Sequence, residues 1–153
     1  MMEVNKKQAG SKIKTFQVPL ATGKIKENIV LTTNSFSNLS KEQIISQAFK
    51  FHSEGNIFEA EMHYQYCIKQ GFEDYRVFSN YGIILKSIGK LKEAELSFRK
   101  AIEIKPDYAE AHSNLGNILK ALGKSQEAEL SYHKAIEINP DYTEAHFNLG
   151  NIL

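Results

Sequence analysis

Cysteine occurs once in the 153 residues, as Cys67, and this excludes an intramolecular disulfide framework. The sequence also lacks any apolar run of the roughly 18–20 residues that a membrane-spanning helix needs. Lysines near the N-terminus are not followed by an apolar segment, so we expect no secretory signal peptide. A cytoplasmic, reducing compartment is therefore the expected location.

The chain has no strong excess of either charge, since its formal net charge is +1. This balance favours neither a nucleic-acid partner nor an anionic membrane. The charges are unevenly distributed, however. Residues 1–40 contain six lysines and two glutamates, whereas residues 41–153 contain 13 basic and 16 acidic side chains. The change predicts a basic, flexible N-terminal tail over residues 1–39 and a folded domain over residues 40–153.

The common catalytic motifs GxGxxG, GxSxG and HExxH and the phosphate-binding P-loop are absent. His63 and Cys67 have a spacing that suits metal ligands, but no third ligand is obvious nearby. A buried, small Cys67 is the better interpretation, because Ala101 and Ala135 occupy the equivalent places. We expect no catalytic residues, no cofactor and no metal, so this chain is predicted not to be an enzyme.

What the sequence does contain is a repeat of 34 residues. Residues 75–108 and 109–142 align without a gap and are identical at 21 of 34 positions. The run NLGNIL occurs at Asn114–Leu119 and again at Asn148–Leu153. We therefore predict repeats over 41–74, 75–108 and 109–142 and a partial fourth over 143–153.

Each repeat shows the pattern of two helices joined by a short turn. Apolar residues recur at helical spacing, glycine follows the first run, and Pro106 and Pro140 end the second run. Gly55, Gly89 and Gly123 are expected to adopt a left-handed conformation at equivalent turns.

Two further patterns concern the helices themselves. Capping boxes are expected at the helix starts, in the pairs Ser40–Gln43, Asp107–Glu110 and Asp141–Glu144. Gly82, Gly116 and Gly150 lie inside first helices, where glycine costs about 1 kcal/mol relative to alanine. Close approach of the paired second helix is the expected reason.

These positions resemble the tetratricopeptide repeat (TPR) family, whose pattern places large, small and proline residues at fixed points of a 34-residue unit. The third repeat carries the pattern at His112, Leu115, Gly116, Leu119, Ala128, Tyr132, Ala135 and Pro140. The second carries it at Phe78, Tyr81, Gly82, Leu85, Ala94, Phe98, Ala101 and Pro106. The first repeat departs from the pattern most, since Gln47, Cys67 and Phe72 replace the usual Leu, Ala and Pro. Among TPR proteins, the sequence is most similar to the arrays of O-GlcNAc transferases and of bacterial TPR proteins joined to transferase domains.

The resemblance implies an all-α fold, a right-handed α-solenoid of antiparallel helix pairs, with an irregular N-terminal tail. It also implies a concave groove lined by the first helices, which binds a protein or peptide segment of unknown identity. The residues that the resemblance places in this groove are Arg76, Ser79, Asn80, Lys86, Ser113, Asn114, Asn117, Lys120, Asn148 and Asn151.

Asn80, Asn114 and Asn148 occupy the same position of successive repeats. A side-chain amide offers two donors and an acceptor, so a row of them can hold the backbone of an extended peptide with little sequence preference. This arrangement resembles the asparagine ladder of the O-GlcNAc transferase array. The alternative is that asparagine at this position only caps or solvates the helix locally.

The carboxylate clamp, by which some TPR domains bind chaperone C-termini, is expected to be absent. The clamp uses Lys and Asn in the first groove helix, where this chain has Ile45 and Phe49, and a basic residue in the third, where Glu110 stands. Peptides ending in EEVD are therefore not expected to bind.

Both ends of the chain leave alternatives open. Phe16–Thr33 could instead pack on the first repeat or lie in the groove as an internal ligand. The last residues, Leu149, Ile152 and Leu153, would lack a second helix to cover them, which predicts self-association or a fragment of a longer protein.

The predicted function is that of a non-catalytic scaffold for protein–protein interaction. The alternative is the substrate-recognition arm of a larger transferase, whose catalytic domain would follow Leu153.

Overall fold

The structure, a computed structural model, describes residues 36–152, so the expected tail lies outside the described residues except for 36–39. Ser40–Leu153 forms one compact unit. Residues 36–152 contain no strand, which confirms the all-α prediction. The helices are α1 (Lys41–Ser53), α2 (Ile57–Lys69), α3 (Tyr75–Ser87), α4 (Leu91–Ile104), α5 (Ala109–Ala121), α6 (Ser125–Ile138) and α7 (Thr143–Gly150).

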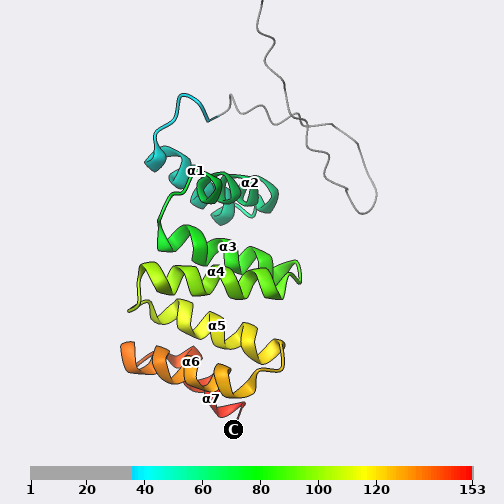
Figure 1. Cartoon of the computed structure of the whole chain (residues 1–153), viewed down its shortest axis with the longest axis vertical. Helices are drawn as coiled ribbons and strands as arrows, with labels where there is room; N and C mark the ends of the chain where they lie inside the picture. The colour runs from blue at the N-terminus through cyan, green and yellow to red at the C-terminus, as the bar shows by residue number, and fades with distance from the viewer. Residues whose placement is uncertain (1–35, 153) are drawn as a thin grey trace, which may run out of the picture. The chain divides into compact units, whose positions relative to one another are not determined.

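The helices form antiparallel pairs that stack in chain order, from α1 to α7 (Figure 1). Helices α1, α3, α5 and α7 begin 34 residues apart, as the period of the sequence requires. Helices α1, α3 and α5 each pair with the helix that follows, and each pair packs on the next, as in an α-solenoid; α7 packs on α6 and α5. None of the helices in residues 36–152 combines the length and apolarity that a bilayer span requires.

Glycine inside a first helix lets the aromatic ring of its paired second helix approach closely. A Cβ atom added to Gly82 would lie 2.9 Å from Phe98 Cζ, and one added to Gly116 would lie 2.5 Å from Tyr132 Cε1. Phe98 and Tyr132 are both fully buried. The predicted close approach is therefore confirmed for these two glycines, whereas nothing lies within 4 Å of such an atom at Gly150.

The turns between paired helices also agree with the sequence. Gly55, Gly89 and Gly123 have φ values of 76°, 77° and 76°, in the left-handed region. In each case the next residue donates its backbone N–H to a carbonyl five positions earlier, which closes the end of the first helix.

The expected capping boxes are confirmed only at the start of α1. Ser40 and Gln43 exchange hydrogen bonds of 2.8 and 3.2 Å between side chain and backbone. The boxes expected at Asp107 and Asp141 are wrong, because α5 and α7 begin one residue later than a box there requires. Asp107 instead accepts a hydrogen bond of 2.9 Å from Lys105 Nζ.

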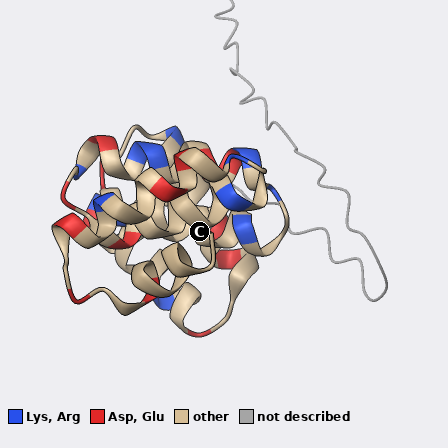
Figure 2. Ribbon diagram, turned by 90° about the horizontal axis from the view of Figure 1, so that it is seen from below, with Lys and Arg blue, Asp and Glu red and all other residues tan. Residues whose placement is uncertain are grey.

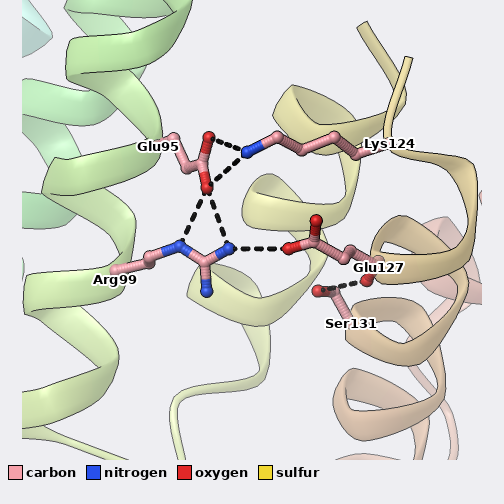
Figure 3. Close-up of polar contacts among 5 residues, drawn as sticks. All are labelled: Glu95, Arg99, Lys124, Glu127 and Ser131. Carbon is pink, nitrogen blue, oxygen red and sulfur yellow. Dashed lines mark hydrogen bonds and ion pairs between the residues drawn. The ribbon is translucent and has the colours of Figure 1, made fainter. Parts of the chain in front are cut away.

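An ion-pair network joins the outer surfaces of α4 and α6 (Figure 3). Glu95, whose side chain is 12% exposed, accepts hydrogen bonds from Arg99 on its own helix and from Lys124 before α6. Arg99 Nη2 also donates to Glu127 of α6, at 3.0 Å. Burial alone would raise the pKa of Glu95, but the Lys124 and Arg99 hydrogen bonds and charges outweigh it and lower that pKa.

The glycine contact predicts a contrast between two alanine substitutions. Gly116→Ala should lower the free energy of unfolding by about 1–3 kcal/mol, because the new methyl group collides with the buried Tyr132 ring. Gly150→Ala should leave it unchanged or raise it slightly, because the position is open. Urea unfolding followed by circular dichroism measures both, and equal effects of the two substitutions would contradict the packing argument.

The network predicts a pH-dependent contribution of Glu95. Because the pKa of Glu95 is lowered on folding, its stabilisation is present above the ordinary value of 4.5 and is lost as the pH falls through the lowered folded value. Glu95→Gln should therefore cost about 1 kcal/mol at neutral pH, and this cost should shrink steadily as the pH falls below 4.5 through the lowered folded value. Glu93→Gln is the control, since no ion pair holds Glu93 among residues 36–152; a pH-independent cost at Glu95 would refute the assignment.

Candidate functional site

The predicted groove residues lie on α3, α5 and α7 or, for Asn151, directly after α7, and α5 contacts both α3 and α7. We call this surface the first-helix face. Its half-exposed or exposed residues are Arg76, Asn80, Lys86, Glu110, Asn114, Asn117, Lys120, Glu144, Asn148 and Asn151. Over the described chain as a whole, acidic and basic positions are interspersed along the ribbon rather than gathered by sign (Figure 2).

Asn117 is the centre of a hydrogen-bond network on this face. Its Oδ1 atom accepts a hydrogen bond of 2.8 Å from the hydroxyl of Tyr132 and one of 3.0 Å from Nδ2 of Asn148. Its own Nδ2 donates to Glu144 Oε1 at 3.3 Å. The amides of Asn117 and Asn148 therefore join α5, α6 and α7, and part of their hydrogen-bonding capacity is used within the protein.

Asn80 also lies beside a tyrosine hydroxyl. Burial raises the pKa of Tyr64, the charge of Cys67 adds to the rise, and a hydrogen bond from the Asn80 side chain opposes it. Tyr64 is the residue of the first repeat that corresponds to Tyr132 of the third. Asn80 therefore has a tyrosine hydroxyl of the preceding repeat as a hydrogen-bond partner.

Asn114 differs from the other two members of the predicted ladder. Among residues 36–152 its side chain has no hydrogen-bond partner, although it is half-buried. The preceding repeat has Phe98 where the others have Tyr64 and Tyr132, and Ile83 where Asn117 stands. Neither side chain can donate or accept a hydrogen bond, so the amide of Asn114 is left available.

Two of the predicted groove residues do not belong to the open surface. Ser79 and Ser113 are each only 1% exposed, and their hydroxyls are buried without a hydrogen bond of good geometry. Tyr108 lies close to Ser79, and Tyr142 lies close to Ser113. Each serine is therefore covered at the junction with the next repeat and cannot reach a ligand there.

Arg76 is only partly available. Its guanidinium donates to both carboxylate oxygens of Asp74, at 3.1 and 2.6 Å, and Asp74 also caps α3. The same guanidinium lies over the Phe49 ring, with Cζ 5.2 Å from its centroid. Arg76 is thus held by its own neighbours, whereas Lys86 is exposed and forms no ion pair in the described part of the chain.

Lys120 and Asn151 meet between neighbouring first helices. Lys120 Nζ donates to the backbone carbonyl of Asn151 at 3.3 Å. This contact fixes the position of the ammonium group but leaves its charge without an anionic partner.

The repeat pattern of the sequence did not predict that the hydroxyl of Tyr132 takes part in the hydrogen bonding of the site. Tyr132 was expected only as a large residue of the repeat pattern, yet its ring is buried while its hydroxyl reaches Asn117. Burial, followed by the charge of Glu144, raises the pKa of this hydroxyl, so it stays protonated and donates. The alternation of Tyr64, Phe98 and Tyr132 was the signal that could have shown it.

The other candidate groups have structural roles. His63 bonds the Glu59 carbonyl and the Gln47 side chain, at 2.7 and 3.3 Å, and Cys67 is buried and free. No cluster of potential metal ligands occurs in residues 36–152.

The histidines at the large-residue position of the repeat bind the preceding loop. His112 and His146 each donate from Nε2 to a proline carbonyl, at 2.9 and 2.8 Å. A hollow of about 400 Å³ lies between α4, α5 and α6, with Ile102, Leu115 and Leu130 in its wall. It is separate from the first-helix face.

Family models match two overlapping parts of the chain. The model described as "Tetratricopeptide repeat" matches residues 109–142, and the one described as "TPR repeat" matches residues 82–123. The first match has the same bounds as the third predicted repeat. A search of curated proteins gives no match.

Solved structures with the same fold include several helical-repeat proteins. The first TPR of Spaghetti (RPAP3), bound to the HSP90 peptide SRMEEVD, has a TM-score of 0.68 at 22% identity, covering 76% of this chain and 94% of that one. MamA has a TM-score of 0.72 at 19% identity, covering 77% and 69%. The Thermobaculum terrenum O-GlcNAc transferase has a TM-score of 0.67 at 26% identity, and the match covers 74% of this chain and only 22% of the transferase.

Proposed function

We propose that this chain, whose residues 82–142 match tetratricopeptide repeat models, is a non-catalytic scaffold that binds an extended peptide segment on its first-helix face. The observation that carries the proposal is the free amide of Asn114, half-buried on that face without a partner among residues 36–152. An amide with no internal hydrogen bond can offer its donors and its acceptor to a ligand without breaking a contact within the protein.

The binding mode differs from a ladder of three equal asparagines. Asn148 already donates to Asn117, and Asn80 already lies beside Tyr64, so each has less capacity left for a ligand. A peptide bond placed over Asn114 can accept from Nδ2 and donate to Oδ1. We therefore propose one principal main-chain anchor at Asn114, flanked by two weaker ones.

Peptide binding is supported by neighbours of the same fold. The RPAP3 domains hold short chaperone peptides, SRMEEVD in one and SGPTIEEVD in the other. Their identity to this chain is 22% and 24%, so the likeness supports only the general idea that this fold can hold a short peptide, and neither the ligand nor its contacts.

The alternative proposal is the recognition arm of a larger transferase. It is supported by the likeness to part of the Thermobaculum terrenum O-GlcNAc transferase. The sequence encoded after Leu153 in the gene distinguishes the two proposals, because a transferase domain there would make this array its substrate-binding arm. A cytoplasmic location remains part of either proposal, since Cys67 is a free thiol.

Self-association through α7 also remains a prediction. Phe147 of α7 is 68% exposed, whereas Leu149 and Ile152 are partly buried against the core. Analytical ultracentrifugation of the 153-residue chain measures this self-association directly.

Because the Asn114 amide has no internal partner among residues 36–152, its removal should affect peptide binding but not the free energy of unfolding. Peptides selected from a displayed library of random 12-residue sequences serve as the probe, with affinity measured by fluorescence anisotropy. Asn114→Ala should weaken their binding about five- to tenfold and leave the unfolding free energy unchanged, because no internal hydrogen bond is lost.

The matched variant is Asn117→Ala, which removes the acceptor of the buried Tyr132 hydroxyl and should cost about 1–3 kcal/mol of stability. Unchanged peptide binding by Asn114→Ala, or failure of the intact chain to enrich any peptide, would refute the proposed anchor.

The first repeat predicts that chaperone tails do not bind. Ile45 is 6% exposed, and Phe49 is half-buried beneath Arg76, so neither place supplies the cation or amide that a terminal carboxylate requires. Labelled SRMEEVD should show no saturable binding to this chain up to about 100 µM, an affinity limit of roughly 5.5 kcal/mol. The RPAP3 domain is the positive control, and micromolar binding to this chain would contradict the prediction.

A further inference from the structure

The first-helix face carries four charges that have no ionic partner. Ion pairs elsewhere in the described chain join Arg99 to Glu95, Lys100 to Glu103 and Lys134 to Glu137. On the first-helix face, Glu110, Glu144, Lys86 and Lys120 have no opposite charge within 4.0 Å among residues 36–152.

The recorded partners of three of these groups are neutral. The Tyr108 hydroxyl donates to Glu110 at 2.7 Å, the Asn117 amide donates to Glu144 at 3.3 Å, and Lys120 donates to a backbone carbonyl at 3.3 Å. Such contacts orient a charged group without neutralising it. The two carboxylates and two ammonium groups therefore keep their full attraction for a charged ligand.

The signs of these four charges are sorted to opposite ends of the helices, whereas Arg76, in the first turn of α3, has the opposite sign to Glu110 and Glu144 and is paired with Asp74. Glu110 and Glu144 lie in the first turns of α5 and α7, and Lys86 and Lys120 lie in the last turns of α3 and α5. Glu110 and Lys120 are ten residues apart on one helix, which corresponds to about 15 Å along its axis. Asn114 lies between them, so an acidic edge and a basic edge flank the proposed main-chain anchor.

An extended peptide matches this arrangement in a specific way. Successive side chains of an extended chain point to opposite sides, and residues i and i+2 are about 6.6–6.8 Å apart. Packed helices are about 8–10 Å apart, which is slightly more than the spacing of residues i and i+2 in the peptide. The long side chains of Lys and Arg can cover the difference between these two spacings. Every second residue of a peptide that crosses α3, α5 and α7 thus faces the acidic edge, and the residues between face the basic edge.

We propose that the first-helix face selects an extended segment in which basic and acidic residues alternate. This inference rests on the proposed function. Basic side chains of the segment pair with Glu110 and Glu144, its acidic side chains pair with Lys86 and Lys120, and its backbone bonds Asn114. A purely basic segment would place cations against the two lysines, and a purely acidic one would place anions against the two glutamates.

Helix stabilisation offers a competing reason for the same residues. Acidic side chains in a first turn and basic ones in a last turn each stabilise a helix by about 0.3–1 kcal/mol through its dipole. That effect makes no distinction between peptides, so a binding experiment separates the two explanations.

The test compares two labelled peptides of identical composition, KEKEKEKE and KKKKEEEE, by fluorescence anisotropy with the 153-residue chain. The alternating peptide should bind at least about tenfold more tightly, and the difference should shrink in high salt as the charges are screened. Equal affinities of the two peptides would overturn the proposal and leave helix stabilisation as the reason for these charges.

Charge reversal supplies the matched variants. Glu110→Lys with Glu144→Lys should lower affinity for the alternating peptide at least about tenfold. Glu93→Lys with Glu129→Lys makes the same change in net charge on the second helices and should leave it unchanged. Equal losses in the two double variants would show that only net charge matters and would overturn the proposal.

A fourfold variant tests the pattern itself. Adding Lys86→Glu and Lys120→Glu to the first double variant inverts both edges, and an alternating peptide can meet the inverted pattern by shifting one residue. Its binding should return to within about threefold of the original, with folding checked by circular dichroism. If the fourfold variant unfolds, the double variants still decide.

The outcomes also separate this inference from the proposed function. Library peptides that bind through Asn114 with no preference for charge alternation would remove the inference and keep the proposed function. Failure of every peptide to bind would remove both.

Discussion

The approach of an aromatic ring to a glycine is the contact on which the second and third repeats depend, whereas Ala48 takes the place of the glycine in the first. At Gly116 there is no room for even one added carbon, since it would lie 2.5 Å from the Tyr132 ring. Because the ring of the second helix can lie directly across the first helix, its buried hydroxyl reaches a side chain of the first-helix face. The hydroxyl of Tyr132 consequently bonds Asn117, the residue that follows Gly116. The contact that closes the core therefore also delivers a polar group to the first-helix face.

Because of this geometry, one buried residue sets the state of a surface amide in the next repeat. Where the ring is Tyr64, a hydroxyl lies beside Asn80; where it is Tyr132, a hydroxyl and the Asn117 amide engage Asn148. Where the ring is Phe98, the amide of Asn114 remains without a partner among residues 36–152. Phenylalanine and tyrosine pack equally well against glycine, so the exchange changes hydrogen bonding while the stacking of the helices is maintained.

The repeat period was enough to predict the helical array but not the chemistry of its surface. Helices α3, α5 and α7 begin 34 residues apart because apolar spacing, glycine turns and prolines all recur in phase. The caps at Asp107 and Asp141 were wrong by a single residue, a difference that helical spacing alone cannot detect. Ser79 and Ser113 were expected in the open, and they are covered because residues of the following loop, Tyr108 and Tyr142, lie against them. Such contacts between repeats involve pairs of positions that no single-repeat pattern contains.

Both sides of the array carry acidic and basic side chains, but among residues 36–152 the ion pairs that join two repeats lie on the outer side. On the outer side, Glu95, Arg99, Lys124 and Glu127 satisfy one another across α4 and α6, so a ligand would have to break existing pairs to gain new ones. On the first-helix face, Glu110, Glu144, Lys86 and Lys120 are held by neutral groups or by none. Binding there forms ion pairs without breaking any, which lowers the cost of association. Charges without an ionic partner among residues 36–152 also occur on the second helices, at Glu93 for example. What sets the proposed binding surface apart is that its four such charges lie on both sides of the Asn114 amide.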